Sequence, residues 1–110
     1  MTVGKLVRDR IPHLIAAEGR TPKVDRLTGT VLRDALYSKL EEEHEELLAA
    51  VTDEDRQEEL ADMIEVLIAL ASIHGLNEAE LMDVVKRKRA DRGGFNEGLF
   101  YIGDDHDIFS

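Results

Sequence analysis

The 110-residue sequence contains no cysteine and only two prolines. Disulfide bonds, zinc sites with thiolate ligands and cysteine nucleophiles are therefore excluded together, and this absence is typical of a protein of the reducing cytoplasm. No glycine-rich or serine-rich tract occurs, and hydrophobic residues make up 43% of the chain. We therefore expect a folded chain, with a single domain over residues 1–110 and the cytoplasm as its location.

The sequence also lacks a hydrophobic run long enough to cross a membrane. Its longest apolar-rich stretch, Met63 to Ile73, contains Glu65 and is far shorter than a membrane-spanning helix. No apolar run follows the first charged residues, so we expect no signal peptide. The formal net charge of −10 would repel a nucleic-acid backbone. Membranes and nucleic acids are therefore not expected among the partners.

The residues that are abundant, among them Ala, Leu, Glu, Lys and Arg, favour helices, and we expect an all-α fold. Pro12 is placed to start a first helix over about residues 12–18, and the composition of residues 20–29 is typical of a loop. From residue 30 to residue 51, apolar residues recur every three or four positions, which predicts a long amphipathic helix.

Two capping patterns predict the remaining helices. Thr52 is a good N-cap for a third helix that ends at Gly75, and Asn77 with Glu80 predicts the start of a fourth helix that runs to about residue 91. Residues 95–110 form a C-terminal tail. Four or five helices of these lengths predict a bundle.

The second half of the third predicted helix is apolar nearly all round. A single chain of this length cannot hide such a helix in one core. We therefore expect oligomerisation to complete the bundle, as a homodimer or a homotetramer.

Acidic residues interrupt the apolar faces of the two long predicted helices. Helical steps from Leu36 through Leu40 to Leu47 include position 43, which is Glu43, and Glu46 lies one turn further on nearly the same face. A carboxylate that faces a core must be protonated, paired or bound to a metal.

The third predicted helix repeats this arrangement. Asp62 leads at helical steps into the apolar stripe, and Glu59 stands one turn before it. Two antiparallel helices joined by a short connection would bring the two pairs together, and only cations relieve the resulting repulsion. All-oxygen ligation favours Mg²⁺, with Mn²⁺ as a substitute. The alternative is that these acidic pairs simply face solvent, as most do.

Neighbouring residues suggest further roles. Glu42 lies beside the ligand pair and is a candidate general base for a water on the metal. Lys39, one turn before Glu43, is placed to bind phosphate oxygens, and a salt bridge to Glu43 is its alternative role.

Basic residues elsewhere are candidates for binding a phosphate chain. We expect Lys88 or Arg92, together with Arg8 or Arg10, to bind the phosphates, although basic residues at the end of a helix also have a favourable interaction with its dipole. Three aromatic residues of the tail are expected to pack in a core or interface, with stacking on a base as the alternative: Phe95, Phe100 and Tyr101.

The order of these motifs resembles the MazG-like, all-α nucleoside triphosphate pyrophosphohydrolases, which include phosphoribosyl-ATP pyrophosphohydrolase. The hallmark of that family is EExxE followed by ExxD, and Glu42, Glu43 and Glu46 match its first part while Glu59 and Asp62 match its second. The opening Lys5–Pro12 and the late Arg92–Phe95 are similar to a subgroup described as phosphoribosyl-ATP pyrophosphohydrolase-like.

The resemblance implies hydrolysis of a nucleotide to its monophosphate and pyrophosphate, with Mg²⁺ held by Glu43, Glu46, Glu59 and Asp62. It also implies a dimer or tetramer with the site near a subunit interface. A house-cleaning role on unwanted nucleotides would follow. Two alternatives stay open: the phosphoribosyl-ATP pyrophosphohydrolase of histidine biosynthesis, and a non-catalytic helical interaction or regulatory module.

Overall fold

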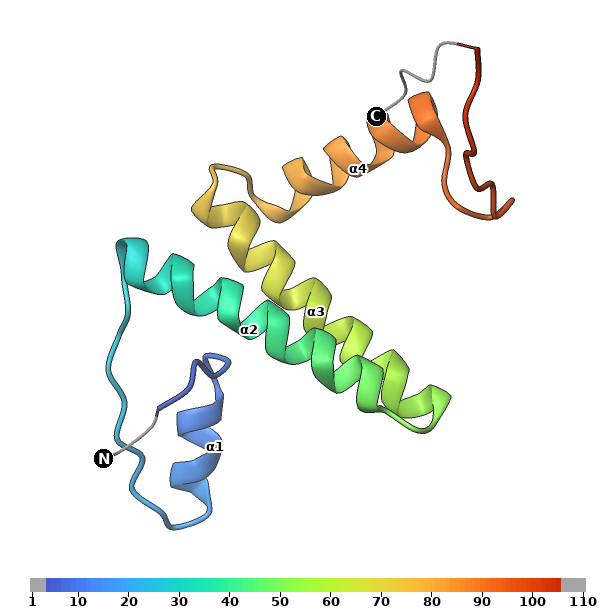
Figure 1. The fold of residues 1–110 in the computed structure, drawn as a ribbon. Helices are drawn as coiled ribbons and strands as arrows, with labels where there is room; N and C mark the ends of the chain where they lie inside the picture. Colours follow the sequence, from blue (N-terminus) through green and yellow to red (C-terminus); the bar gives the residue numbers. More distant parts are fainter. Residues whose placement is uncertain (1–3, 106–110) are drawn as a thin grey trace.

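A computed structural model describes residues 4–105, in which all regular secondary structure is helical (Figure 1). The helices are α1 (Ile11–Ala17), α2 (Gly29–Ala49), α3 (Asp53–Ile73) and α4 (Glu78–Arg92). The predicted all-α class is confirmed, and the predicted ranges differ from these bounds only near the helix ends. Among the described residues, no helix is both long and apolar enough to cross a membrane.

Local capping explains where α3 and α4 begin. The Thr52 hydroxyl oxygen accepts a hydrogen bond from the backbone N–H of Asp55 at 3.1 Å. At α4, the Asn77 side chain accepts from the N–H of Glu80 at 2.8 Å, and the Glu80 carboxylate accepts from the N–H of Asn77 at 2.9 Å. Each bond satisfies a backbone donor that a helix start leaves without a partner, so both predicted N-caps are confirmed.

The two long helices form an antiparallel hairpin, joined by residues 50–52 (Figure 1). Their apolar stripes meet along the hairpin, and the buried residues of this core are Leu36, Val66 and Leu70. Leu6, from the segment that precedes α1, packs against the same core. The core therefore fixes the N-terminal segment beside the hairpin.

Helix α4 leaves the hairpin at the C-terminal end of α3 and points away from it (Figure 1). The radius of gyration is 18.6 Å, with extents of 64 × 35 × 29 Å. A compact chain of this length would have a radius of gyration of about 13 Å. The single chain is therefore an extended arrangement of helices that buries few side chains.

Apolar residues stay exposed along the outer side of α3. Leu60, Ile64 and Leu67 recur at steps of four and three residues, which places them on one face, and Ile64 is 56% exposed. We call these three residues the outer stripe of α3. The excess of apolar residues in this helix therefore leaves apolar side chains exposed in the single chain.

The aromatic residues of the tail do not pack in the core of the chain. Phe95 is 99% exposed and Phe100 is 89% exposed. They do not pack in the core of a single chain, because the segment after α4 leads away from the α2–α3 hairpin (Figure 1), and their packing in an interface stays a prediction. The acidic end of the tail begins with Asp104 and Asp105, which are exposed, and its remainder lies outside the described residues.

Candidate metal centre

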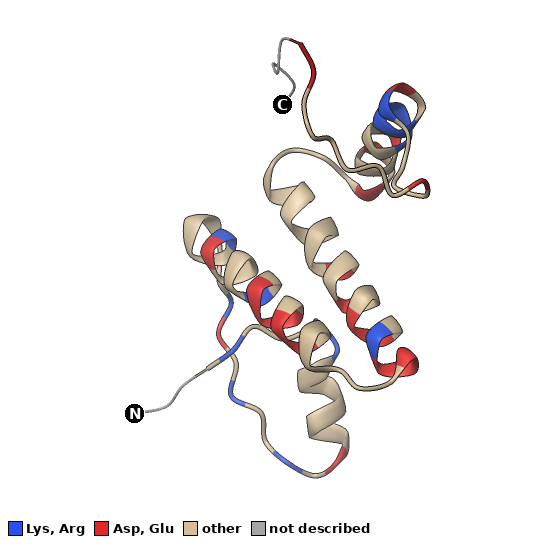
Figure 2. Cartoon of the chain, turned by 45° about the vertical axis from the view of Figure 1, so that its right-hand side comes forward, with Lys and Arg blue, Asp and Glu red and all other residues tan. Residues whose placement is uncertain are grey.

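The α2–α3 hairpin places acidic residues of both helices opposite one another (Figure 2). Glu43 is only 6% exposed, because it continues the stripe of α2 that buries Leu36 against α3. On α3, Glu59 and Asp62 are half-buried and lie one turn apart. The antiparallel pairing of the two helices brings the three carboxylates together.

Two groups of carboxylates meet at Glu43. In one group, ligand oxygens of Glu43, Glu59 and Asp62 all lie within 4.8 Å of one another. In the other, the same spacing holds for Glu42, Glu43 and Glu46. All four predicted metal ligands therefore belong to one connected cluster, with Glu43 at its centre. Their role as ligands stays a prediction.

Two oxygens in this cluster are buried and have no hydrogen-bond partner among residues 4–105: Glu43 Oε2 and Glu59 Oε2. Leaving a buried carboxylate ionised without a compensating cation or donor costs on the order of several kcal/mol. A bound divalent cation would supply that compensation. The donor set consists of carboxylate oxygens alone, which fits a hard ion such as Mg²⁺ or Mn²⁺.

Crowding of negative charge changes the acidity of Glu59. When Glu59 is protonated, its carboxyl group can donate a hydrogen bond to Glu43. This bond, partial burial, and the negative charges of Glu46 and Glu43 together raise the pKa of Glu59 to about 7. In the absence of a metal, a proton therefore partly neutralises the cluster near neutral pH. A cation that binds the cluster must displace this proton.

Lys39 is the basic partner of the α2 carboxylates. Its Nζ lies 3.4 Å from an oxygen of Glu42 and 3.5 Å from an oxygen of Glu43. Burial alone lowers the pKa of Lys39, but attraction to Glu42 and Glu43 outweighs burial and raises that pKa above its usual value. Lys39 therefore stays protonated, and the salt bridge to Glu43 considered as its alternative role is present.

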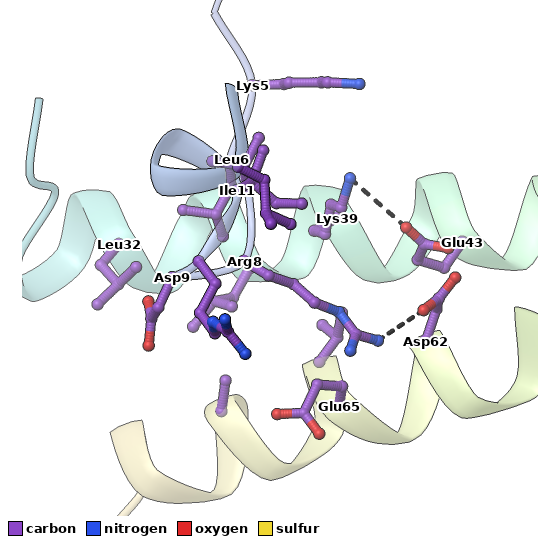
Figure 3. A pocket seen from close by; sticks show the side chains of 16 residues that line it. Lys5, Leu6, Arg8, Asp9, Ile11, Leu32, Lys39, Glu43, Asp62 and Glu65 are labelled. Atoms are coloured by element: carbon purple, nitrogen blue, oxygen red, sulfur yellow. Dashed lines mark hydrogen bonds and ion pairs between the residues drawn. The ribbon is translucent and has the colours of Figure 1, made fainter. Parts of the chain in front are cut away.

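Arg8 reaches the cluster from outside the hairpin. Its guanidinium Nη2 donates a hydrogen bond to Asp62 Oδ1 at 2.5 Å. Figure 3 shows this side chain extending across a pocket towards Asp62, while Lys39 points to Glu43 from the other side. Arg8 thus lies next to a predicted ligand, and the interaction with Asp62 was not predicted from the sequence.

The pocket has a volume of about 840 Å³ and lies between the N-terminal segment, α1 and the hairpin. One end, the charged end, contains Lys39, Glu43 and Asp62 (Figure 3). The rest of its wall is mixed, because charged residues such as Asp9 and Lys5 lie among apolar ones there (Figure 3). The apolar residues of this wall are Leu6, Val7, Ile11, Leu14, Leu32, Leu36, Val66 and Ala69.

Part of this wall was not predicted from the sequence. Lys5, Asp9 and Glu65 line the pocket. No local signal identifies them, because the docking of residues 5–10 on the hairpin depends on contacts between segments far apart in the sequence.

The predicted phosphate-binding residues are only partly brought together. Arg8 and Arg10 both line the pocket. Lys88 and Arg92 lie on α4, whose basic end points away from the acidic cluster (Figure 2), and neither lines the pocket. Within one chain, the structure therefore does not bring the basic end of α4 to the site.

Comparison with known proteins identifies a family for this chain. The phosphoribosyl-ATP pyrophosphohydrolase family (PRA-PH) matches residues 10–89. An uncharacterized protein of Mycolicibacterium smegmatis is 52% identical over 50 residues, which are 46% of this chain and 51% of that protein. The match thus spans about half the length of this relative, and no solved structure matches significantly. Because the matched region includes both acidic motifs and most of the described fold, the chain belongs to the phosphoribosyl-ATP pyrophosphohydrolase family.

Proposed function

We propose that this protein is a Mg²⁺-dependent nucleotide pyrophosphohydrolase that converts a nucleoside triphosphate, or a related nucleotide, to the monophosphate and pyrophosphate. The observation that carries this proposal is the position of Glu43. This residue is buried, one of its oxygens has no hydrogen-bond partner among the described residues, and it belongs to both clusters of three acidic residues. Membership of the family supports the same kind of reaction.

The proposed ligands are Glu43, Glu46, Glu59 and Asp62. A divalent cation held there, Mg²⁺ or in its place Mn²⁺, would neutralise phosphate oxygens and favour attack by water on phosphorus. Glu42 accepts the proton of the attacking water, for which its side chain is suitably open, at 42% exposure. Lys39 and Arg8 bind phosphate oxygens, since both carry cations to the charged end of the pocket.

The two ends of the pocket suggest how the substrate lies. The phosphate chain occupies the charged end, and the nucleoside lies against the apolar wall near Ile11, Leu14 and Leu32. Apolar surface with a few polar groups is typical of small-molecule sites. Asp9 and Glu65 are the acceptors available there for amino groups of a base.

Association of the chain with itself is part of the proposal. The extended shape and the exposed outer stripe of α3 support a homodimer or homotetramer. If Lys88 or Arg92 binds phosphate, it does so in a site of another copy, because its own α4 points away from the cluster (Figure 2). The single domain over residues 1–110 is the unit that associates.

The finer identity of the substrate is proposed as an unwanted nucleotide, which makes the protein a house-cleaning enzyme of the cytoplasm. The family name favours phosphoribosyl-ATP as a second candidate. The two substrates share the same chemistry at the phosphates. They differ in the second ribose phosphate, which a substrate screen distinguishes directly.

The test is pyrophosphate release from canonical and modified nucleoside triphosphates and from phosphoribosyl-ATP, with Mg²⁺ or with a chelator. We expect Mg²⁺-dependent release from at least one of them, and loss of that release in Glu43→Gln, which removes a ligand. Glu41→Gln is the matched control, because Glu41 is an exposed residue of the same helix outside both carboxylate groups. Equal activity of Glu43→Gln and wild type would exclude the proposed site. Folded protein that neither binds Mg²⁺ nor releases pyrophosphate would favour the non-catalytic module.

A further inference from the structure

One cation from outside the α2–α3 hairpin contacts a proposed metal ligand in the part of the chain that the structure describes. It is the guanidinium of Arg8, which donates to Asp62 Oδ1 at 2.5 Å. Arg8 belongs to the segment before α1, and Figure 3 shows that its side chain crosses the pocket to make this contact. An ion that binds Asp62 through Oδ1 therefore meets Arg8.

A guanidinium and a divalent cation are rivals for the same carboxylate. Both bind through its oxygen lone pairs, and like charges so close together repel each other strongly in a partly buried site. The Arg8 side chain is 57% exposed, whereas the Asp62 side chain is 41% exposed. Arg8 is thus open enough to leave Asp62 and be solvated, and exposed ion pairs of this kind are weak.

We propose that Arg8 is the resident counter-ion of the metal-free site, which a divalent cation displaces from Asp62, and that the freed guanidinium then binds a phosphate of the substrate. The inference rests on the proposed metal site and adds an exchange of partners to it. Arginine suits both partners, because its planar fork of donors fits carboxylate and phosphate oxygens equally well.

The exchange has a consequence for the order of events. While Arg8 holds Asp62, its side chain lies across the pocket, between the apolar wall and the acidic cluster (Figure 3). Displacement by the metal moves that side chain away and provides a positive charge where the phosphates arrive. Binding of the metal therefore prepares the pocket for the nucleotide, with the side chain of Arg8 as the group that changes position.

A different role for Arg8 predicts the opposite result. If Arg8 stayed on one oxygen of Asp62 and oriented the other towards the metal, loss of Arg8 would weaken metal binding, as loss of an outer partner of a metal ligand usually does. Under the exchange that we propose, loss of Arg8 removes a competitor and strengthens metal binding. The sign of the effect on metal affinity therefore distinguishes the two roles.

The experiment measures Mg²⁺ binding by calorimetry, without nucleotide, for wild type, Arg8→Ala and Arg10→Ala. We expect Arg8→Ala to bind Mg²⁺ more tightly by roughly two- to fivefold, the factor that corresponds to an exposed ion pair. Arg10→Ala removes the same charge two positions away without touching Asp62, so its affinity should change less. With Mg²⁺ present, Arg8→Ala should bind inorganic pyrophosphate more weakly than wild type.

The NMR signal of the Arg8 guanidinium gives a second readout. Mg²⁺ should shift this signal in wild type, because the guanidinium leaves Asp62 Oδ1. Unchanged or weaker Mg²⁺ binding by Arg8→Ala, or an Arg8 signal that Mg²⁺ does not shift, would overturn the inference and leave the proposed function intact. A wild-type protein that binds no Mg²⁺ would overturn both.

Discussion

Glu59 titrates far from the ordinary range of a glutamate. The hydrogen bond that its protonated form can donate to Glu43, partial burial and the negative charges of Glu46 and Glu43 raise its pKa to about 7. Because this pKa is higher in the folded chain than in the unfolded chain, the protonated group favours the folded state at low pH. That contribution is lost as the pH rises through the range from the ordinary value towards about 7.

The elevated pKa predicts a pH-dependent response to Mg²⁺. Below about pH 7 the cation must displace a proton, whereas above it the cluster is already ionised. We expect Mg²⁺ to raise the melting temperature more at about pH 8 than at about pH 6, as measured by differential scanning fluorimetry at fixed protein concentration. An equal rise at both pH values would mean that the ion displaces no proton from Glu59.

Neutralising Glu59 should also change the metal-free protein. Glu59→Gln removes one of the crowded charges, so we expect a higher melting temperature than that of wild type at about pH 8 without metal, together with loss of the Mg²⁺-dependent rise. Glu58→Gln is the control, since Glu58 is exposed and outside both carboxylate groups. A Glu59→Gln variant that is destabilised without metal would contradict the repulsion on which the site depends.

At the level of single elements, local chemistry determines the helices and tertiary contacts determine the pocket. The starts of α3 and α4 could be predicted because Thr52 and Asn77 cap their own helices. That Glu43 lies opposite Asp62 could be predicted, because each long helix has one apolar stripe and the short connection makes the two stripes pack against each other. The contact of Arg8 with Asp62 could not, because 54 positions separate the two residues and no periodicity connects them.

The cap of α3 gives a test at this scale. Thr52→Ala removes the acceptor for the N–H of Asp55, and we expect it to lower the free energy of unfolding by about 1 kcal/mol in urea denaturation. Thr28→Ala is the matched control, because Thr28 is the N-cap of α2 but its side chain makes no capping hydrogen bond. Equal losses in the two variants would show that the Thr52 hydroxyl contributes nothing specific.

For the whole molecule, the shape of one chain leaves the bundle incomplete. The radius of gyration of 18.6 Å and the position of α4 leave apolar surface of α3 without cover. The composition of that helix predicts an interface there, which stays a prediction. Sequence reasoning could not give the direction of α4, because the segment between α3 and α4 sets that direction and carries no hydrophobic pattern of its own.

Self-association should depend on the outer stripe of α3. Ile64→Glu places a charge in its middle, and we expect weaker association by sedimentation velocity over a range of concentrations, since burying an unpaired charge is unfavourable. Val24→Glu is the control, because Val24 is an equally exposed apolar residue in the loop before α2. If Ile64→Glu associates as wild type does, the interface lies elsewhere.

The central claim is that the carboxylates around Glu43 hold a divalent cation. Anomalous diffraction from crystals grown with Mn²⁺ measures this most directly, because the scattering locates the ion without reference to activity. We expect a peak among Glu43, Glu59 and Asp62, whose ligand oxygens already lie within 4.8 Å of one another. Crystals in which Mn²⁺ binds only at exposed carboxylates, with none at this cluster, would contradict the claim.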